Sequence, residues 1–248
     1  MFSFFSKKSY LIDLFKHGYT DIHCHVLPCI DDGAKNVHES EALLNEMQNI
    51  GFKHITATPH IMDGVWENTP ETITTALANL KMHLSKTGLS EFSIATAAEY
   101  MLDNNFEKLL HNHEELLPLK DNKILVELSY FNPPLNLKEI LFQLQVKGYS
   151  PILAHPERYN FYHNNYSQYK KLKEAGCQLQ LNLLSLTPHY GKGVQKIAYQ
   201  LLDDDLIDFV GSDTHHLQHI ALLKTIQVKA KYITKIQKLV EANELLLP

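Results

Sequence analysis

The chain contains 248 residues, 44% hydrophobic and 21% charged, an ordinary globular composition with enough length for one large domain. Its formal net charge is −5 and it has no block of lysines and arginines, so nucleic acid is a poor candidate for its partner. The three cysteines lack the regular spacing of a secreted disulfide framework, and no apolar stretch approaches the roughly 20 residues of a membrane span. We therefore expect a cytoplasmic protein without a membrane span.

Two kinds of segment alternate along the chain, and no linker or change of composition interrupts them. We predict a single domain over 19–248, preceded by an N-terminal extension over 1–18. Segments rich in β-forming residues occur at 19–26, 54–60, 92–100, 123–129, 151–156, 178–183 and 208–213. Helical spacing of apolar residues occurs between them at 36–51, 70–84, 136–148, 169–176 and 194–206.

The first helical segment carries the clearest local signals. Asn36 can cap the helix, and Glu39 stands three residues later, as in a capping box. Gly51 suits the position just after the helix end. The sequence therefore predicts that this helix begins next to Asn36 and ends before Gly51.

Seven predicted strands that alternate with helices favour parallel βα units. The sequence has no Gly-rich nucleotide-binding loop, which favours a closed or nearly closed barrel over an open sheet. An open doubly wound sheet remains the alternative. In parallel barrels the active site lies at the carboxyl ends of the strands, so these ends are the places to search for functional residues.

Residues able to bind metal ions stand at most of these strand ends. His23 and His25 are two residues apart, so they point to one side of the first strand while Cys24 points to the other. A lone histidine or glutamate at such a position is usually only solvated or hydrogen-bonded. The pattern recurs, however, in Asp32 of the following loop and at the later strand ends in His60, Glu99, Glu127, His155, Asp213 and His215. This recurrence predicts a cluster of metal ions at one rim.

Other reactive residues do not support a different chemistry. Cys24 and Cys29 are expected to be structural, because no second cysteine pair follows them and Cys24 points away from the cluster. A cysteine-dependent phosphatase is unsupported, since no arginine stands six residues after Cys24, Cys29 or Cys177. A serine triad is unsupported, since no Gly-x-Ser-x-Gly motif occurs. His216 is expected to point away from His215. The remaining histidines that we set aside, as lacking a convergent partner, are His38, His54, His83, His111, His113 and His163.

A series of short motifs connects the chain with a known family. In order from about residue 19 to the C-terminus they are DIHCH, IDDGA, TPH, AAEY, VELS, AHPERY and GSDTH. In this combination the chain resembles the polymerase and histidinol phosphatase (PHP) superfamily and, more narrowly, the bacterial capsule-locus tyrosine phosphatases of CpsB/YwqE type. The resemblance implies an α/β fold, a distorted seven-stranded (β/α) barrel, and three divalent ions. Manganese is the first choice, with iron or zinc as alternatives.

The same resemblance implies roles for individual residues. The first ion site would comprise His23, His25, Glu99 and Asp213, the second Glu99, Glu127 and His155, and the third Asp32, His60 and His215. Arg158 of AHPERY would bind the phosphate through its bidentate fork. Catalysis would involve Arg158, His60 and Asp213, with a hydroxide held by the ions as nucleophile and His60 as a proton donor to the leaving oxygen.

One position departs from the family pattern. Relatives carry a further arginine shortly after their SD-x-H element, whereas this chain reads HHLQHIALLK there. His219 lies near the expected place, but a histidine is not equivalent to a permanently charged guanidinium. The residue that replaces the second phosphate-binding arginine is therefore open.

The resemblance implies phosphotyrosine on a protein as substrate, with the tail of a bacterial tyrosine kinase that controls exopolysaccharide export as the expected partner. Aromatic residues that could stack on a phosphotyrosyl ring, or that could equally be packing residues, are Trp66, Tyr100, Tyr130, Phe131, Tyr159 and Tyr162. The alternatives are a PHP phosphatase acting on a small phosphomonoester such as histidinol phosphate, an amidohydrolase-like barrel, and a non-catalytic phosphotyrosine-binding module.

Overall fold

Parallel strands form the centre of the molecule. The computed structural model describes residues 9–247. A three-stranded sheet consists, in order, of β2 (Tyr19–Cys24), β3 (Phe52–Ala57) and β5 (Ser93–Thr96). A six-stranded sheet runs in the order β10 (Phe209–Gly211), β9 (Gln178–Asn182), β8 (Ser150–Ala154), β7 (Lys123–Glu127), β6 (Glu99–Met101) and β4 (His60–Ile61). Every pairing within these two sheets is parallel.

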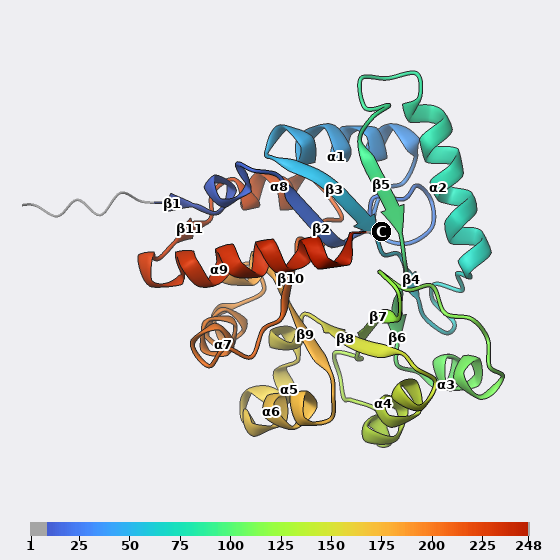
Figure 1. Cartoon of the computed structure of the whole chain (residues 1–248), viewed down its shortest axis with the longest axis vertical. Helices are drawn as coiled ribbons and strands as arrows, with labels where there is room; N and C mark the ends of the chain where they lie inside the picture. Colours follow the sequence, from blue (N-terminus) through green and yellow to red (C-terminus); the bar gives the residue numbers. More distant parts are fainter. Residues whose placement is uncertain (1–8, 248) are drawn as a thin grey trace, which may run out of the picture.

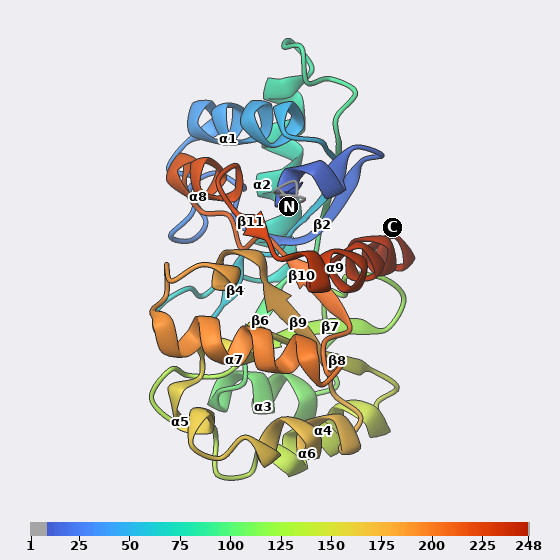
Figure 2. The same ribbon diagram turned by 90° about the vertical axis from the view of Figure 1, so that its left-hand side faces the viewer.

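Helices surround these strands on the outside (Figure 1). They are α1 (Val37–Asn49), α2 (Pro70–Leu84), α3 (Asn104–His111), α4 (Leu137–Val146), α5 (Asn160–His163), α6 (Ser167–Glu174), α7 (Lys192–Asp203), α8 (Leu217–Leu223) and α9 (Ala230–Ala242). Short 3-10 turns occur at η1 (Leu11–Phe15), η2 (Pro156–Arg158), η3 (Leu183–Leu186) and η4 (Asn243–Leu246). Figure 2 shows α8 beside α1 and α9 beside β10. The five predicted helices are confirmed, whereas α3, α5, α8 and α9 were not predicted.

Two of the predicted strands are each divided in the structure. The segment 54–60 forms β3 and β4, with Pro59, which has no N–H to donate, between them. The segment 92–100 likewise forms β5 and β6. The first halves belong to one sheet and the second halves to the other, while an isolated parallel bridge between Cys24 and Thr214 joins β2 to the segment after β10. The predicted α/β class with parallel strands is confirmed, and its seven strand regions are distributed over two sheets.

The local signals at the first helix are confirmed in two respects and wrong in one. The Oδ1 atom of Asn36 accepts hydrogen bonds from the backbone N–H groups of His38 and Glu39, both at 3.0 Å. Gly51 follows the helix with φ at +104°, a conformation that favours glycine. The capping box does not form, because the Glu39 carboxylate accepts instead from the N–H of Lys35, at 3.0 Å.

Residues 9–15 of the predicted extension pack against the rest of the molecule. β1 (Ser9–Tyr10) pairs antiparallel with β11 (Gln227–Val228), and Leu11 and Phe15 of η1 are buried. The first eight residues lie outside the described part of the chain. The boundary between an extension and the domain therefore stays a prediction. No helix within residues 9–247 is both long and apolar enough to cross a bilayer.

Candidate metal centre

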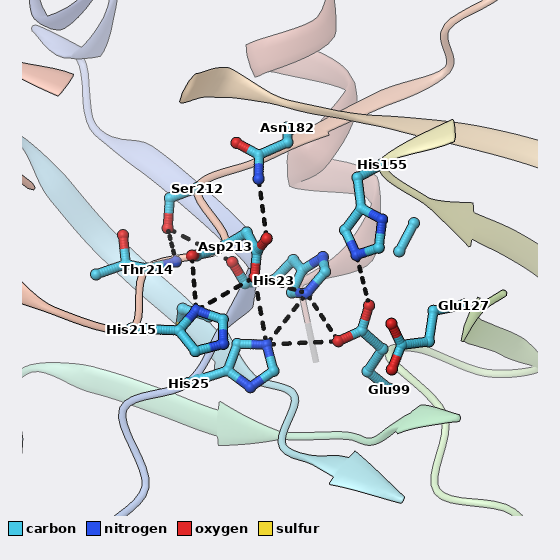
Figure 3. Close-up of polar contacts among 12 residues, drawn as sticks. His23, His25, Glu99, Glu127, His155, Asn182, Ser212, Asp213, Thr214 and His215 are labelled. Atoms are coloured by element: carbon cyan, nitrogen blue, oxygen red, sulfur yellow. Dashed lines mark hydrogen bonds and ion pairs between the residues drawn. The ribbon is translucent and has the colours of Figure 1, made fainter. Parts of the chain in front are cut away.

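The end of β2 supplies the two histidines around which the site is built. Both imidazole Nε2 atoms point to one place, 3.3 Å apart (Figure 3). The Glu99 Oε2 atom lies 3.2 Å from the His23 Nε2 atom and 3.4 Å from that of His25. The Asp213 Oδ1 atom lies 3.4 Å from each of them. Alternation along the strand therefore predicted correctly that the two imidazoles face the same point.

A second group of ligand atoms lies beside the first. The His60 Nδ1 atom is 2.9 Å from Glu127 Oε1 and 3.1 Å from Glu99 Oε2, so Glu99 belongs to both groups. The His155 Nε2 atom approaches the other oxygen of Glu99, at 3.1 Å. A shared carboxylate of this kind can bridge two cations.

A third group lies at the more exposed edge of the cluster. The Asp32 carboxylate, whose side chain is 54% exposed, lies 3.3 Å from His215 Nε2 and 3.6 Å from His60 Nε2. His25 lies with these three residues, and its ring stacks on that of His215 with centroids 3.9 Å apart. Asp32 is thus the candidate ligand most open to solvent.

The structure brings all nine predicted ligand residues together, although their grouping differs in detail from the prediction. Sets whose ligand atoms lie within 4.8 Å of one another are His25, Asp32, His60 and His215; His23, His155 and Asp213; His23, His25 and Glu99; and His60, Glu99 and Glu127. His60 therefore contacts the second group as well as the third, and His155 lies closer to the first group than we expected. Which residue binds which ion stays a prediction.

The unsatisfied atoms in this cluster test whether the residues suit metal ions. The His60 Nδ1, Glu99 Oε2 and Glu127 Oε1 atoms are buried and have no hydrogen-bond partner within residues 9–247, despite their short separations. Buried polar atoms are rarely left in this state, because the loss of hydration costs free energy. A cation between them would satisfy the nitrogen and both oxygens at once, so the residues present fit bound divalent metals.

The electrostatics of the cluster agree with this conclusion. Burial alone would lower the pKa of His23, but the carboxylates of Glu99 and Asp213 raise it above its ordinary value. Burial lowers and Glu127 raises the pKa of His60, which reaches about 9. Burial would raise the pKa of Glu99, yet His23 and His60 hold it well below its ordinary value. The buried carboxylates thus keep their negative charge only in the presence of positive neighbours.

Sequence reasoning missed the residues that orient these histidines. The Nδ1 atom of His23 lies 2.8 Å from Gln180 Oε1, and the Nδ1 atom of His25 lies 2.8 Å from Asp31 Oδ2. Because these oxygens accept hydrogen bonds, the proton of each ring belongs on Nδ1 and the lone pair on Nε2, which faces the cluster. Asp31 precedes the predicted ligand Asp32, and Gln180 lies on β9, so only the packing distinguishes them from other polar residues.

Arg158 lies next to the cluster and is fixed on several sides. Its Nη1 atom donates to Asp213 Oδ2 at 2.7 Å. Its guanidinium lies over the ring of Tyr130, 4.9 Å from the centroid, and over that of Tyr190, at 4.2 Å. The Asn182 amide donates both to Asp213 Oδ2, at 2.9 Å, and to the Tyr190 hydroxyl, at 3.2 Å. Tyr190 and Asn182 were not predicted, since their role depends on where η3 and the following loop return the chain.

Two candidate ligands also have unusual backbone conformations. His155 has φ at +34° and Asp213 has φ at +49°. Side chains other than glycine rarely adopt the left-handed region, and such conformations concentrate at functional sites. His155 directly follows β8, and Asp213 stands two residues after β10, so both lie where the chain leaves the sheet.

His219 does not replace the second arginine of the family. Its Nδ1 atom accepts a hydrogen bond from the backbone N–H of His215, at 3.3 Å, and lies 3.3 Å from the Asp213 carbonyl oxygen. Burial and the neighbouring His215 lower its pKa to about 4, so its ring is neutral near pH 7. A neutral imidazole supplies no permanent charge to a phosphate.

The aromatic candidates separate into two kinds. Tyr100, Tyr159 and Tyr162 are buried, so they are packing residues. Tyr130 is 45% exposed, and its ring centroid lies 6.0 Å from that of His155. Phe131 is exposed as well, and Trp66 is half-buried in the loop after β4. Tyr130 is therefore the aromatic residue best placed to contact a substrate.

In this protein the carboxyl ends of parallel strands bring histidines and carboxylates together, and several of their ligand atoms are unsatisfied. A site of this kind places the protein in the class of metal-dependent α/β hydrolases. Comparison with known proteins narrows the class. Residues 19–245 match the family described as "Capsular polysaccharide synthesis, CpsB/CapC", and the chain belongs to this family. The resemblance inferred from the sequence motifs is thus confirmed.

Individual relatives agree with this assignment. The chain is 34% identical over 199 residues to the tyrosine-protein phosphatase YwqE of Bacillus subtilis, covering 80% of this chain and 78% of that protein. It is 33% identical over 205 residues to the tyrosine-protein phosphatase CpsB of Streptococcus pneumoniae, covering 79% of this chain and 83% of the relative. A crystal structure from work on these two proteins, described as unique metal-dependent tyrosine phosphatases, has a TM-score of 0.77 at 32% identity, covering 92% of this chain and 94% of its own.

A more distant structure supports the fold alone. The histidinol phosphate phosphatase of Lactococcus lactis, solved with zinc, L-histidinol and phosphate, has a TM-score of 0.52 at 13% identity. It covers 91% of this chain and 93% of its own.

Proposed function

We propose that this protein is a metal-dependent protein-tyrosine phosphatase that acts in the control of capsule or exopolysaccharide synthesis. The observation that carries the proposal is the convergence of buried carboxylates and imidazoles with unsatisfied ligand atoms, next to a fixed arginine. Membership of the CpsB/CapC family and the tyrosine-phosphatase names of YwqE and CpsB supply the substrate class.

The proposed metal centre holds three divalent ions, with manganese as the first choice and iron or zinc as alternatives. The proposed ligands are His23, His25, Asp32, His60, Glu99, Glu127, His155, Asp213 and His215. This mixture of imidazole and carboxylate without thiolate suits all three metals. When bound, the ions would lower the pKa of a water molecule and attract the phosphate oxygens.

The protein's own side chains have separate proposed tasks. Arg158 binds a phosphate oxygen with the N–H groups that Asp213 does not use. Its positive charge stabilises the negative charge that develops in the transition state of phosphoryl transfer. The Asp213 carboxylate and the two tyrosine rings keep the guanidinium in this position. His60, whose side chain is 13% exposed, belongs to the cluster and would donate a proton to the leaving oxygen only through a ring nitrogen that binds no ion.

The proposed substrate is a tyrosine-phosphorylated protein, with the tail of a bacterial tyrosine kinase as the proposed partner. Tyr130 would contact the aromatic ring of the phosphotyrosine while Arg158 binds its phosphate. We further propose that the two sheets belong to one distorted seven-stranded barrel, which the bridge between Cys24 and Thr214 supports. A boundary at residues 18 and 19, and a cytoplasmic location, are part of the same proposal.

The test combines metal analysis with turnover. The purified protein is assayed for bound metal and for release of phosphate from p-nitrophenyl phosphate, before and after removal of metal by a chelator. We expect activity to disappear with the metal and to return when Mn²⁺ is added. Retained activity in a metal-free sample would exclude the proposed chemistry.

Substrate class requires a second comparison. Kinetics on a phosphotyrosyl peptide and on histidinol phosphate are measured with the same preparation. We expect the larger kcat/KM for the peptide. A larger value for histidinol phosphate would assign the site to a small molecule, and metal and phosphopeptide binding without any phosphate release would indicate a binding module.

A further inference from the structure

A second group of metal-binding side chains lies between α1 and α2, away from the candidate metal centre. His38 and Glu41 stand three residues apart in the first turns of α1, so they share one face of that helix. His83 lies in the last turn of α2, which runs beside α1 (Figure 1). The expectation that His38 and His83 lack a convergent partner is therefore wrong.

The three side chains are in direct contact. The His83 Nε2 atom lies 2.8 Å from Glu41 Oε2. The rings of His38 and His83 meet edge to face, with centroids 5.0 Å apart and planes at 87°. Each residue offers one ligand atom, and these three atoms lie within 4.8 Å of one another. Two helices that are separate in the sequence thus present two imidazoles and one carboxylate to one point.

This donor set is selective by its chemistry. Two imidazoles with one carboxylate suit borderline metals such as Zn²⁺, Ni²⁺ and Co²⁺, whereas Ca²⁺ and Mg²⁺ prefer oxygen ligands. Ligand atoms around a tetrahedral zinc ion with bonds of about 2.0–2.1 Å are separated by roughly 3.3 Å. His38 is exposed, so its side chain has room to rotate toward that separation.

The proposed ligands are also accessible to an ion and its water ligands. The side chains of His83 and Glu41 are 23% and 28% exposed. The place is therefore open to solvent, and water can complete the coordination of an ion that has three protein ligands.

We propose that His38, Glu41 and His83 form a binding site for one divalent transition-metal ion, which links the first turns of α1 to the last turn of α2. The ion would stabilise the folded chain by connecting two helices that otherwise meet through side-chain packing and one hydrogen bond. This site does not depend on the proposed phosphatase activity, because it shares no residue with the candidate metal centre.

The experiment compares proteins that all keep the candidate metal centre. Metal bound at that centre therefore contributes equally to each of them. Full-length protein without an affinity tag is first loaded with Mn²⁺ and then titrated with Zn²⁺, and bound zinc is counted after gel filtration. Wild type is compared with Glu41→Gln, whose amide can keep the hydrogen bond to His83 but is a poor zinc ligand. His83→Gln removes an imidazole, and His111→Gln, at an exposed histidine on α3, is the matched control.

We expect wild type and His111→Gln to bind one more zinc equivalent than Glu41→Gln and His83→Gln, or to bind it at least about tenfold more tightly. Zinc at about ten times its dissociation constant should raise the Tm of wild type by about 2–5 °C relative to the two site variants. Equal zinc binding and equal Tm shifts in all four proteins would overturn the proposal. Turnover of p-nitrophenyl phosphate by the Mn²⁺-loaded proteins should be equal, which separates this site from the candidate metal centre.

Discussion

The two ends of β2 have the same backbone and opposite chemistry. At its amino end the ring of Tyr19 stacks on Phe15, with centroids 4.4 Å apart, and meets Phe52 edge to face at 4.8 Å. The nearby Asn243 side chain donates to the carbonyl oxygens of Thr20 and Val210, at 2.8 and 2.7 Å. Every group in this description is either apolar and packed or polar and paired.

At the carboxyl end, four residues further on, the same strand presents His23 and His25 to the buried carboxylate of Glu99. Here ligand atoms remain without hydrogen-bond partners within residues 9–247. One end of the strand is therefore arranged for stability, whereas the other keeps unsatisfied polar atoms that a bound cation would satisfy. Substitutions at the two ends should therefore affect different measurements.

The largest expected effect is on turnover, at the carboxyl end. His155→Ala and Asp213→Ala should each lower kcat/KM for p-nitrophenyl phosphate by at least about 10²–10³-fold, because each removes a proposed ligand and Asp213 also holds Arg158. Steady-state kinetics on protein saturated with Mn²⁺ provides the measurement. Circular dichroism should show a folded chain in both variants. Full activity in either one would contradict the ligand assignment.

The amino end should give the converse result. Phe52→Ala removes a buried ring that contacts both Phe15 and Tyr19, so the free energy of unfolding should fall by about 3–5 kcal/mol. Urea unfolding followed by circular dichroism measures this change.

The control for that variant is the activity of its folded fraction. Below the unfolding transition, kcat per active site should remain close to the wild-type value, since Phe52 touches no candidate ligand. Phe52→Leu is a milder variant at the same position. If it loses turnover while its free energy of unfolding stays at the wild-type value, the separation of the two ends is incorrect.

The sequence allowed much of this comparison to be predicted, for physical reasons. Side chains two residues apart on a strand share a face, which was sufficient to place His23 with His25. Carboxyl ends of parallel strands lie at one rim, which was sufficient to add distant residues such as Glu99 and Asp213. Both inferences depend on local geometry that repeats in every strand.

The features that were missed depend on tertiary packing. Gln180 and Asp31 reach the histidines only because β9 and the loop after β2 approach them, and nothing in their own segments indicates this. The Glu39 carboxylate accepts a hydrogen bond from the backbone N–H of Lys35, and not from that of the N-cap residue Asn36. The contact between His38 and His83 likewise exists only because α1 lies beside α2.

An intermediate effect, on metal affinity, is expected from substitution of a residue that orients a metal ligand without binding metal itself. Gln180→Ala removes the acceptor for the Nδ1 proton of His23, so the ring can rotate and change tautomer. Metal affinity should fall about 10–100-fold. Titration of metal-free protein with Mn²⁺, monitored by restored turnover, measures the affinity.

Gln178→Ala is the matched control on the same strand. Gln178 lies at the amino end of β9, where its side chain accepts from the Lys123 ammonium, at 2.6 Å. It should leave the metal affinity unchanged. Equal losses in both variants would show that a general loosening of β9, and not the orientation of His23, determines the affinity.

The smallest expected effect concerns Tyr130, whose ring, like that of Tyr190, lies against the Arg158 guanidinium. An exposed cation–π contact contributes about 0.5–1 kcal/mol, so Tyr130→Leu should raise KM for an aryl phosphate by about two- to fivefold with little change in kcat. Tyr130→Phe keeps the ring and should behave as wild type. Because Tyr190 and Asp213 still hold the guanidinium, loss of the Tyr130 ring weakens substrate binding more than it disturbs the phosphate site. A large fall in kcat for Tyr130→Leu would instead mean that this ring itself fixes the position of Arg158 during phosphate transfer.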